Sequence, residues 1–214
     1  IKFMKQSERY SYIIDWFDKN MPTAESELHY SNAFELLVAI VLSAQCTDKR
    51  VNQTTPALFS SYPTPQVMAD ASIEDIQAHI KSISYPNNKA KHLQGLSQVL
   101  VKDFNGVVPD TIDELQKLPG VGRKTANVML AVYFGKAAMP VDTHVFRLAH
   151  RIGLVSASAK TPFEVEQQLS AHIPESLLSK AHHWLLLHGR YVCTARNPQC
   201  ASCGIKTWCK YITK

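Results

Sequence analysis

Four of the five cysteines lie close together near the end of the chain, and they limit what this region can fold into. A chain of 214 residues needs no disulfide framework, so clustered thiols are more typical of ligands that converge on one metal centre. Four thiolates suit a cubane iron–sulfur cluster or zinc by ligand type, but zinc modules usually pair two short Cys-x-x-Cys knuckles and one is present here. The candidate ligands are Cys193, Cys200, Cys203 and Cys209.

A turn with two glycines is the second strong constraint. The run Leu-Pro-Gly-Val-Gly-Arg-Lys-Thr-Ala occupies positions 118–126, and a helix-forming stretch follows it. Gly120 and Gly122 can take positive φ and carry no Cβ, so backbone N–H groups can approach an anion at a helix N-terminus. An ordinary helix–helix turn is the alternative, but Arg123 and Lys124 favour a DNA phosphate. The candidate phosphate contacts are Gly120, Val121, Gly122 and Arg123.

Helical periodicity runs along the chain without sustained period-two alternation, which predicts an all-α fold. Residues 7–20 form an amphipathic pattern, and residues 33–42 are apolar almost all round, as in a helix buried on every side. A capping box at 111–114 predicts a short helix before the glycine turn. Residues 82–90 predict a turn-rich interruption before the next helix, and one α-helix is expected over 123–134.

Lys124 and Asp142 are candidates for chemistry. Asp142 precedes the predicted helix that starts at Thr143, so it is expected to be an N-cap. Lys124 falls in a first helical turn, where the helix dipole and partial burial would favour the neutral, nucleophilic amine. A helix of about 18 Å followed by a linker of up to about 23 Å lets Asp142 return to Lys124. A solvated lysine and a purely capping aspartate are the alternatives.

Composition sets wider limits. The formal net charge of +5 is compatible with a polyanionic partner, and 45% hydrophobic residues are enough for a sizeable core. No apolar run approaches the roughly 20 residues of a membrane helix, and residues 1–5 show no signal-peptide pattern. We therefore expect an intracellular protein, in the cytoplasm or nucleoid, without a membrane partner.

Taken together, these segments resemble the helix-hairpin-helix DNA glycosylases. The run Leu-Pro-Gly-Val-Gly-Arg-Lys-Thr-Ala-Asn, the later Val-Asp-Thr-His and the cysteine spacing are similar to the endonuclease III branch, and the resemblance extends from Ala33 to Cys209. It implies two helical lobes with a DNA-binding groove between them. Residues 28–137 would form a helical barrel with the hairpin, and residues 1–27 with 138–214 a lobe holding a 4Fe-4S cluster.

The resemblance also implies a function: a base-excision-repair DNA glycosylase and AP lyase that removes oxidised pyrimidines. Lys124 would attack C1′ of the damaged nucleotide, form a Schiff base with the sugar and nick the strand by β-elimination. Asp142 would assist lysine deprotonation and stabilise positive charge on the sugar. The expected partner is double-stranded DNA with damaged pyrimidines or abasic sites, bound by a monomer.

Further DNA contacts follow from the same resemblance. Gln45 would enter the duplex where the damaged base has left, although helix termination before a Thr47 cap explains the same residues, and Asp48 would lie near the substrate pocket. Tyr85 takes the place of the family's second wedge residue, although it can also pack inward. Arg196, between the first two clustered cysteines, would meet a phosphate. We assign the three histidines His182, His183 and His188 to packing or hydrogen bonding.

Three other functions fit parts of the sequence. An adenine-mismatch glycosylase of the same superfamily lacks the lysine and carries a catalytic Glu near 43–47, where this chain has none. A non-catalytic iron–sulfur DNA-binding protein would need the hairpin but not Lys124 with Asp142. An electron-transfer protein would need the cysteines alone. Trapping of a covalent intermediate separates the lyase from the non-catalytic protein, and an electron-transfer protein would show redox cycling that does not depend on damaged DNA.

Overall fold

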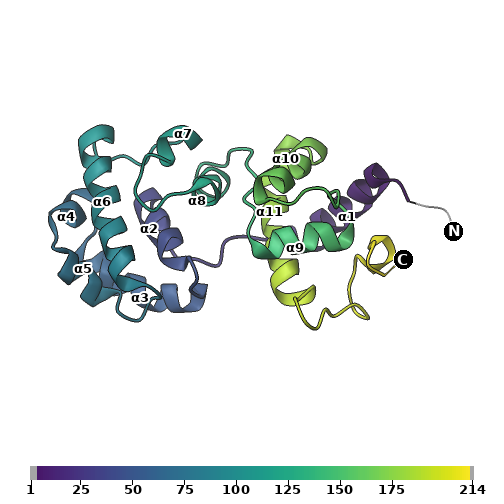
Figure 1. Ribbon diagram of the computed structural model, residues 1–214, viewed down its shortest axis with the longest axis horizontal. Helices are drawn as coiled ribbons and strands as arrows, with labels where there is room; N and C mark the ends of the chain where they lie inside the picture. The colour runs from purple at the N-terminus through teal and green to yellow at the C-terminus, as the bar shows by residue number, and fades with distance from the viewer. Residues whose placement is uncertain (1–3, 213–214) are drawn as a thin grey trace. The chain divides into compact units, whose positions relative to one another are not determined.

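The computed structural model describes residues 4–212, and every regular element in that range is a helix (Figure 1). The all-α prediction is therefore confirmed. The chain divides into two compact units, Ile1–Ser26 with Gly135–Lys214, and Glu27–Phe134. Within residues 4–212 no helix has the length and apolar character needed to cross a membrane.

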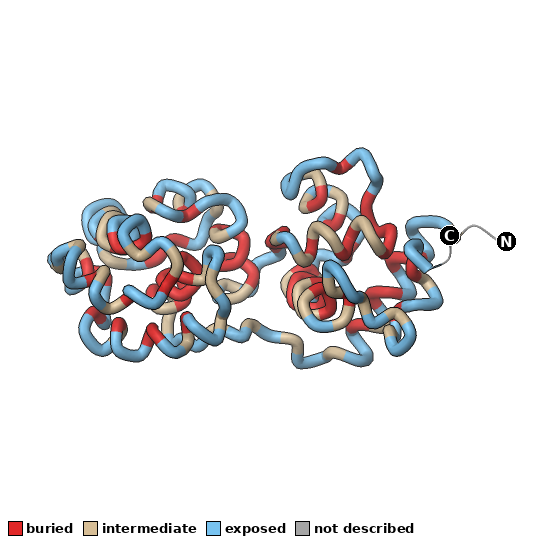
Figure 2. Tube along the Cα trace, turned by 60° about the horizontal axis from the view of Figure 1, so that its bottom comes forward, coloured by how far each residue is buried: buried red, intermediate tan, exposed pale blue. Residues whose placement is uncertain are grey.

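The unit Glu27–Phe134 is built around one apolar helix. Residues 36–42 of α2 are at most 4% exposed, as their sequence predicted, and Figure 2 shows where buried segments alternate with exposed ones along the chain. The long helix α6 packs against α2, α4 and α5 (Figure 1). The helices of this unit are α2 (Ala33–Ser43), α3 (Asp48–Ser61), α4 (Pro65–Asp70), α5 (Ile73–His79), α6 (Pro86–Phe104), α7 (Ile112–Leu115), α8 (Arg123–Val128) and the π-helix η1 (Met129–Tyr133).

Short polar side chains begin most of these helices. Each accepts a hydrogen bond from a backbone N–H in the first turn, which satisfies a donor that the helix itself cannot satisfy. The capping residues of α2 to α5 and of α7 are Asn32, Thr47, Thr64, Ser72 and Thr111.

Two predicted boundaries are wrong. The expected interruption at 82–90 ends earlier, because α6 already begins at Pro86. Proline suits the first helical position, since its φ is preset and the N–H that it lacks would have had no partner. The expected α-helix over 123–134 changes at Met129 into η1, where the turns are wider.

The other unit joins the beginning of the chain to its end. Its helices are α1 (Gln6–Asn20), α9 (Thr143–Ile152), α10 (Pro162–His172), the 3-10 helix η2 (Glu175–Leu177), α11 (Leu178–Leu187), the π-helix η3 (His188–Val192) and the 3-10 helix η4 (Lys206–Trp208). The apolar face predicted for the first helix is buried in the core of this unit, and its residues are Tyr10, Ile13, Ile14 and Phe17.

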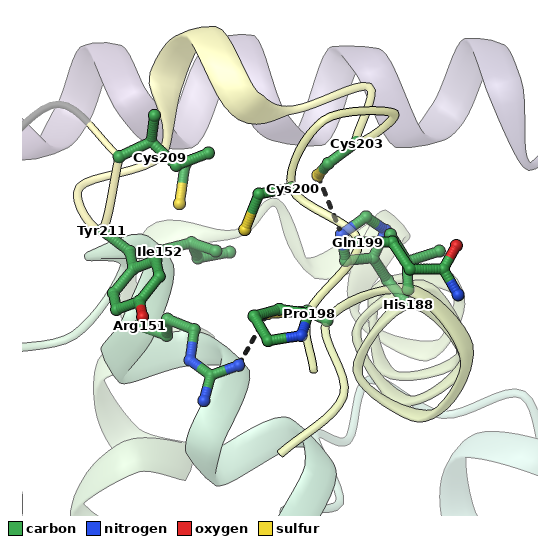
Figure 3. Close-up of a pocket in the computed structure, with 12 residues that line it drawn as sticks. Arg151, Ile152, His188, Pro198, Gln199, Cys200, Cys203, Cys209 and Tyr211 are labelled. Atoms are coloured by element: carbon green, nitrogen blue, oxygen red, sulfur yellow. Dashed lines mark hydrogen bonds between the residues drawn. The ribbon is translucent and has the colours of Figure 1, made fainter. Parts of the chain in front are cut away.

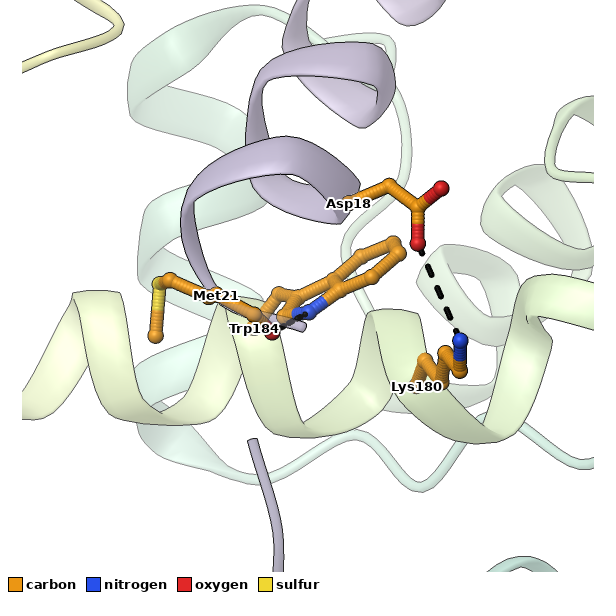
Figure 4. A network of polar contacts seen from close by, with 4 residues as sticks. All are labelled: Asp18, Met21, Lys180 and Trp184. Carbon is orange, nitrogen blue, oxygen red and sulfur yellow. Dashed lines mark hydrogen bonds and ion pairs between the residues drawn. The ribbon is translucent and has the colours of Figure 1, made fainter. Parts of the chain in front are cut away.

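Packing at the end of α1 holds this helix against the later part of the chain in the same unit. Phe17 and Trp184 are fully buried, and their rings stack with centroids 6.0 Å apart. The Trp184 Nε1–H donates to the carbonyl of Met21 at 2.7 Å, and Lys180 pairs with Asp18 at 3.8 Å (Figure 4). That ion pair is half exposed, so it contributes little compared with the buried rings.

We predict that Phe17→Ala lowers the free energy of unfolding by about 3–5 kcal/mol, because it leaves a cavity beside Trp184. Phe163→Ala is the matched control: Phe163 is 45% exposed, so the same truncation is expected to cost less than about 1 kcal/mol. Denaturant unfolding of the two variants checks this, and equal losses would contradict the packing role of Phe17.

Candidate functional site

The two glycines of the turn between α7 and α8 differ in what they do. Gly120 has φ of +79°, and a Cβ there would lie 2.9 Å from the His92 side chain, so both backbone and space exclude other residues. Gly122 has φ of −88°, and a Cβ would meet nothing within 4 Å. Of the two glycines that could take positive φ, Gly120 does and Gly122 does not. Between them Val121 is buried, and its N–H donates to the Leu118 carbonyl at 3.0 Å.

Lys124 is the second residue of α8 and is exposed, as is Arg123 before it. The expected partial burial of Lys124 is therefore wrong. The second half of α8, from Ala126 to Val128, is buried, and the first turn lies outside the core. Gly122 has no side chain that could cap the first turn of α8, in which Lys124 lies.

Asp142 caps α9, as predicted. Its Oδ1 accepts a hydrogen bond from the Val145 N–H at 2.8 Å, and the residue is partly buried. This bond fixes the position of the carboxylate. Asp142 therefore lies at a helix end that holds its carboxylate in place, which is compatible with the capping role and with a catalytic role.

Gln45 follows the end of α2 in an unusual conformation. It is exposed and has φ of 54°, in the left-handed region that few non-glycine residues occupy. Thr47 then caps α3 by accepting from the Arg50 N–H, and Asp48 is partly buried as the first residue of that helix. The capping role of Thr47 is confirmed, and Gln45 is held away from the core.

Tyr85, the residue before α6, shares this conformation. Its φ is 57° and it is 62% exposed, which excludes the alternative that its ring packs inward. The loop before it is attached to α3, because Arg50 donates to the Ser82 carbonyl at 3.1 Å and the hydroxyls of Thr54 and Ser82 lie 3.1 Å apart.

Lys89 connects these two loops and was missed by the sequence reasoning. It is 5% exposed, and its Nζ donates to the carbonyls of Leu42 at 2.8 Å and Ala44 at 2.6 Å. Burial lowers the pKa of the amine, and neighbouring Cys46 acts in the opposite direction. A lysine in the first turn of a helix gives no sequence signal that its end is buried.

The four clustered cysteines line one pocket in the unit that contains α1 and α9, and the labelled sulfur atoms point into it (Figure 3). No three His, Cys, Asp or Glu side chains among residues 4–212 are arranged to hold one metal ion. Four thiols that line one pocket are the ligand set that the predicted iron–sulfur cluster requires. Burial raises the pKa of the Cys203 and Cys209 thiols, so cluster binding must displace protons.

Two side chains from outside the cysteine segment contact the thiols. Arg151 of α9 donates to the Cys193 sulfur at 3.4 Å and to the Thr194 carbonyl at 2.8 Å. His188 Nε2 lies 3.5 Å from the Cys203 sulfur, and burial lowers its pKa to about 4, so the ring is neutral at neutral pH. The predicted hydrogen-bonding role of His188 is confirmed.

Arg147 and Arg151 were missed. They are spaced i, i+4, so they lie on one face of α9, and Arg147 donates to the carbonyls of Gly189 at 2.6 Å and Cys193 at 3.1 Å. The sequence signal that could have identified them is the pair of arginines one helical turn apart, after Asp142. Arg196 is exposed in its loop, which closes through the Gln199 N–H and the Val192 carbonyl at 2.9 Å.

Comparison with known proteins gives two family matches. Residues 38–175, more than half of the chain, match the model of the HhH-GPD superfamily base excision DNA repair proteins. Residues 193–209, from the first to the last clustered cysteine, match the iron–sulfur binding domain of endonuclease III.

Relatives that align over nearly their whole length belong to the same family. Endonuclease III of Rickettsia conorii is 48% identical over 206 residues, covering 96% of this chain and 97% of the relative. Endonuclease III of Bacillus subtilis is 45% identical over 207 residues, covering 97% and 93%. A solved structure of a trapped endonuclease III–DNA covalent intermediate, an estranged-adenine complex, matches with a TM-score of 0.92 and 43% identity over 98% of both chains.

We predict that Cys200→Ala lowers the iron content of the purified protein and destabilises the unit that contains α1 and α9, because one ligand of the pocket is lost. Cys46→Ala is the control, since Cys46 does not line the pocket. Iron and sulfide analysis, visible absorption and thermal unfolding give the readout. Stoichiometric zinc in a colourless wild-type protein prepared without oxygen would contradict the assignment.

Proposed function

We propose roles for individual residues in the reaction of this chain, which belongs to the endonuclease III family of base-excision DNA-repair enzymes. It is a DNA glycosylase with AP lyase activity, and its cofactor is a 4Fe-4S cluster. The residue roles, the preferred lesions and the mode of DNA binding that follow are our proposal.

Lys124 is the nucleophile in this proposal. The observation that carries it is an exposed lysine in the first turn of α8, directly after the Gly120 turn. Its amine attacks C1′, the bond from C1′ to the base breaks, and the base leaves with the bonding electrons. The sugar ring then opens at the C1′–O4′ bond, O4′ takes up a proton, and C1′ forms a Schiff base with Lys124. The Schiff base loses a proton from C2′, and β-elimination expels the 3′ phosphate, which breaks the strand on the 3′ side. Trapping of a related endonuclease III covalently on DNA supports this chemistry.

Asp142 supplies the negative charge for the same steps. A carboxylate fixed by the Val145 N–H needs no reorganisation as positive charge develops on the sugar. It can also accept the proton that Lys124 must lose before it attacks. We assign it both roles, in addition to its cap on α9.

The remaining contacts hold DNA and expose the lesion. The hairpin binds phosphate through Gly120, Val121, Gly122 and Arg123; Gly122 offers open space above the helix start, since no atom would contact a Cβ there. The exposed Arg196 meets a second phosphate. Gln45 pairs with the orphaned base, Tyr85 stacks in the gap left by the extruded nucleotide, and Asp48 lies at the substrate pocket.

The four cysteines hold the 4Fe-4S cluster. As four thiolates leave no open ligand position, the cluster supplies folding and the placement of Arg196 rather than a reaction step. The proposed substrates are oxidised pyrimidines and abasic sites in double-stranded DNA, bound by a monomer in the cell interior, at the nucleoid. The adenine-mismatch and non-catalytic alternatives lack an observation that favours them.

We predict that Lys124→Gln abolishes covalent trapping by borohydride on a duplex with one thymine glycol, because the amide nitrogen cannot form a Schiff base. Iron content and the unfolding midpoint should stay at wild-type values, since Lys124 is exposed. Lys102→Gln, an exposed lysine near the end of α6, is the control. Trapping by Lys124→Gln at the wild-type level would refute the assignment.

We predict that Asp142→Asn lowers the single-turnover rate by about a hundredfold or more while duplex affinity changes by less than about threefold. Asparagine caps helices as well as aspartate does, so the start of α9 should be preserved. Rates and binding are measured on the same lesion duplex. Equal losses in rate and affinity would leave Asp142 with the capping role alone.

A further inference from the structure

We propose that Lys89 is a positioning residue for base excision, which holds the end of α2 and the start of α6 in one register so that Gln45 and Tyr85 enter the duplex together. The proposal rests on the wedge roles given to these two residues under the proposed function. It adds a residue that touches neither DNA nor the reacting atoms.

The contacts of Lys89 join the two loops directly. Its Nζ donates to the carbonyls of Leu42 and Ala44, and Ala44 immediately precedes Gln45. Its own N–H donates to the Tyr85 carbonyl at 3.1 Å, which closes the first turn of α6. One residue therefore bonds through its backbone to Tyr85 and through its side chain to the peptide next to Gln45.

The two loops need such support because both are strained. Gln45 and Tyr85 have φ of 54° and 57°, and each left-handed non-glycine residue costs on the order of 1–3 kcal/mol unless its surroundings fix it. Both side chains are also exposed, so packing against the core does not orient them. Hydrogen bonds to the adjacent backbone are what remains to fix their direction.

Burying an ammonium group is energetically unfavourable. Lys89 is 5% exposed, and a methionine would occupy a similar volume without the desolvation cost of a charge. The C-terminal carbonyls of α2 offset that cost, since they lack partners within the helix and carry the negative end of its dipole. What a lysine adds at this position is directional bonding to the loop of Gln45.

Lys89→Met tests the proposal in the iron–sulfur-loaded enzyme. On a duplex with one thymine glycol we expect the single-turnover excision rate to fall by about tenfold or more, since small displacements of positioning groups cost that much. On a preformed abasic site in an unpaired bubble, where no base must be extruded, the rate should stay within about twofold of wild type. Lys102→Met is the matched control and should match wild type on both substrates.

A test in a second background separates positioning from general damage. In a chain that already carries Gln45→Ala and Tyr85→Ala, Lys89→Met should lower the duplex rate by less than about twofold, because the residues through which it acts are gone. Equal losses on duplex and bubble, an unchanged duplex rate, or a full tenfold further loss in this background would each overturn the proposal.

If Lys89→Met does not fold, Lys89→Gln carries the same comparison, since its shorter carboxamide still donates to a carbonyl. A loss confined to the duplex supports the proposal, and equal or no losses overturn it. The fluorescence of 2-aminopurine beside the lesion reports unstacking without chemistry: Lys89→Met should reduce its rise on binding. Failure of wild-type trapping would instead refute Lys124 as nucleophile, and leaves this fluorescence test of Lys89 intact.

Discussion

The cysteine segment depends on hydrogen bonds from arginines of α9. Between Cys193 and Cys209 the regular structure is one short 3-10 helix, η4. Turns within the segment bond many of its later carbonyls, such as those of Pro198, Cys200 and Cys203, but the carbonyls of its first three residues take their partners from α9. Arg151 reaches the carbonyls of Thr194 and Ala195, and Arg147 reaches that of Cys193. Because Asp142 caps α9, the helix that supports the proposed cluster ligands also fixes the proposed catalytic carboxylate.

Backbone groups at helix ends, which have no partner within their own helix, account for the positions of the other proposed functional residues. The end of α2 is bonded by Lys89, the start of α9 by Asp142, and the start of α8 has no side-chain cap. A helix end must find hydrogen-bond partners from its own loop, from another helix or from a ligand. For the start of α8, after the hairpin, we propose the third solution, with an anion as the partner.

The sequence predicted what depends on neighbours along the chain. The caps Thr47 and Asp142 and the positive φ of Gly120 follow from residues within one turn, and the cysteine spacing predicted the four thiols that line one pocket. Contacts between distant residues were not accessible: Lys89 lies 47 positions from Leu42, and Arg151 lies 42 from Cys193. The exposure of Lys124 depends on how little of α8 reaches the core, which periodicity does not reveal.

Tyr85 shows how local preference can be overruled. A bulky residue with positive φ is rare, and a residue before proline normally prefers extended backbone, so the Tyr85–Pro86 pair is disfavoured twice. The conformation persists because its surroundings determine it: Pro86 starts α6, Lys89 bonds the Tyr85 carbonyl, and Arg50 bonds that of Ser82. A loop that only linked two helices could relax by returning Tyr85 to extended backbone. Strain maintained at an exposed aromatic side chain is better explained by a partner that the ring must meet, and an opened base stack is such a partner.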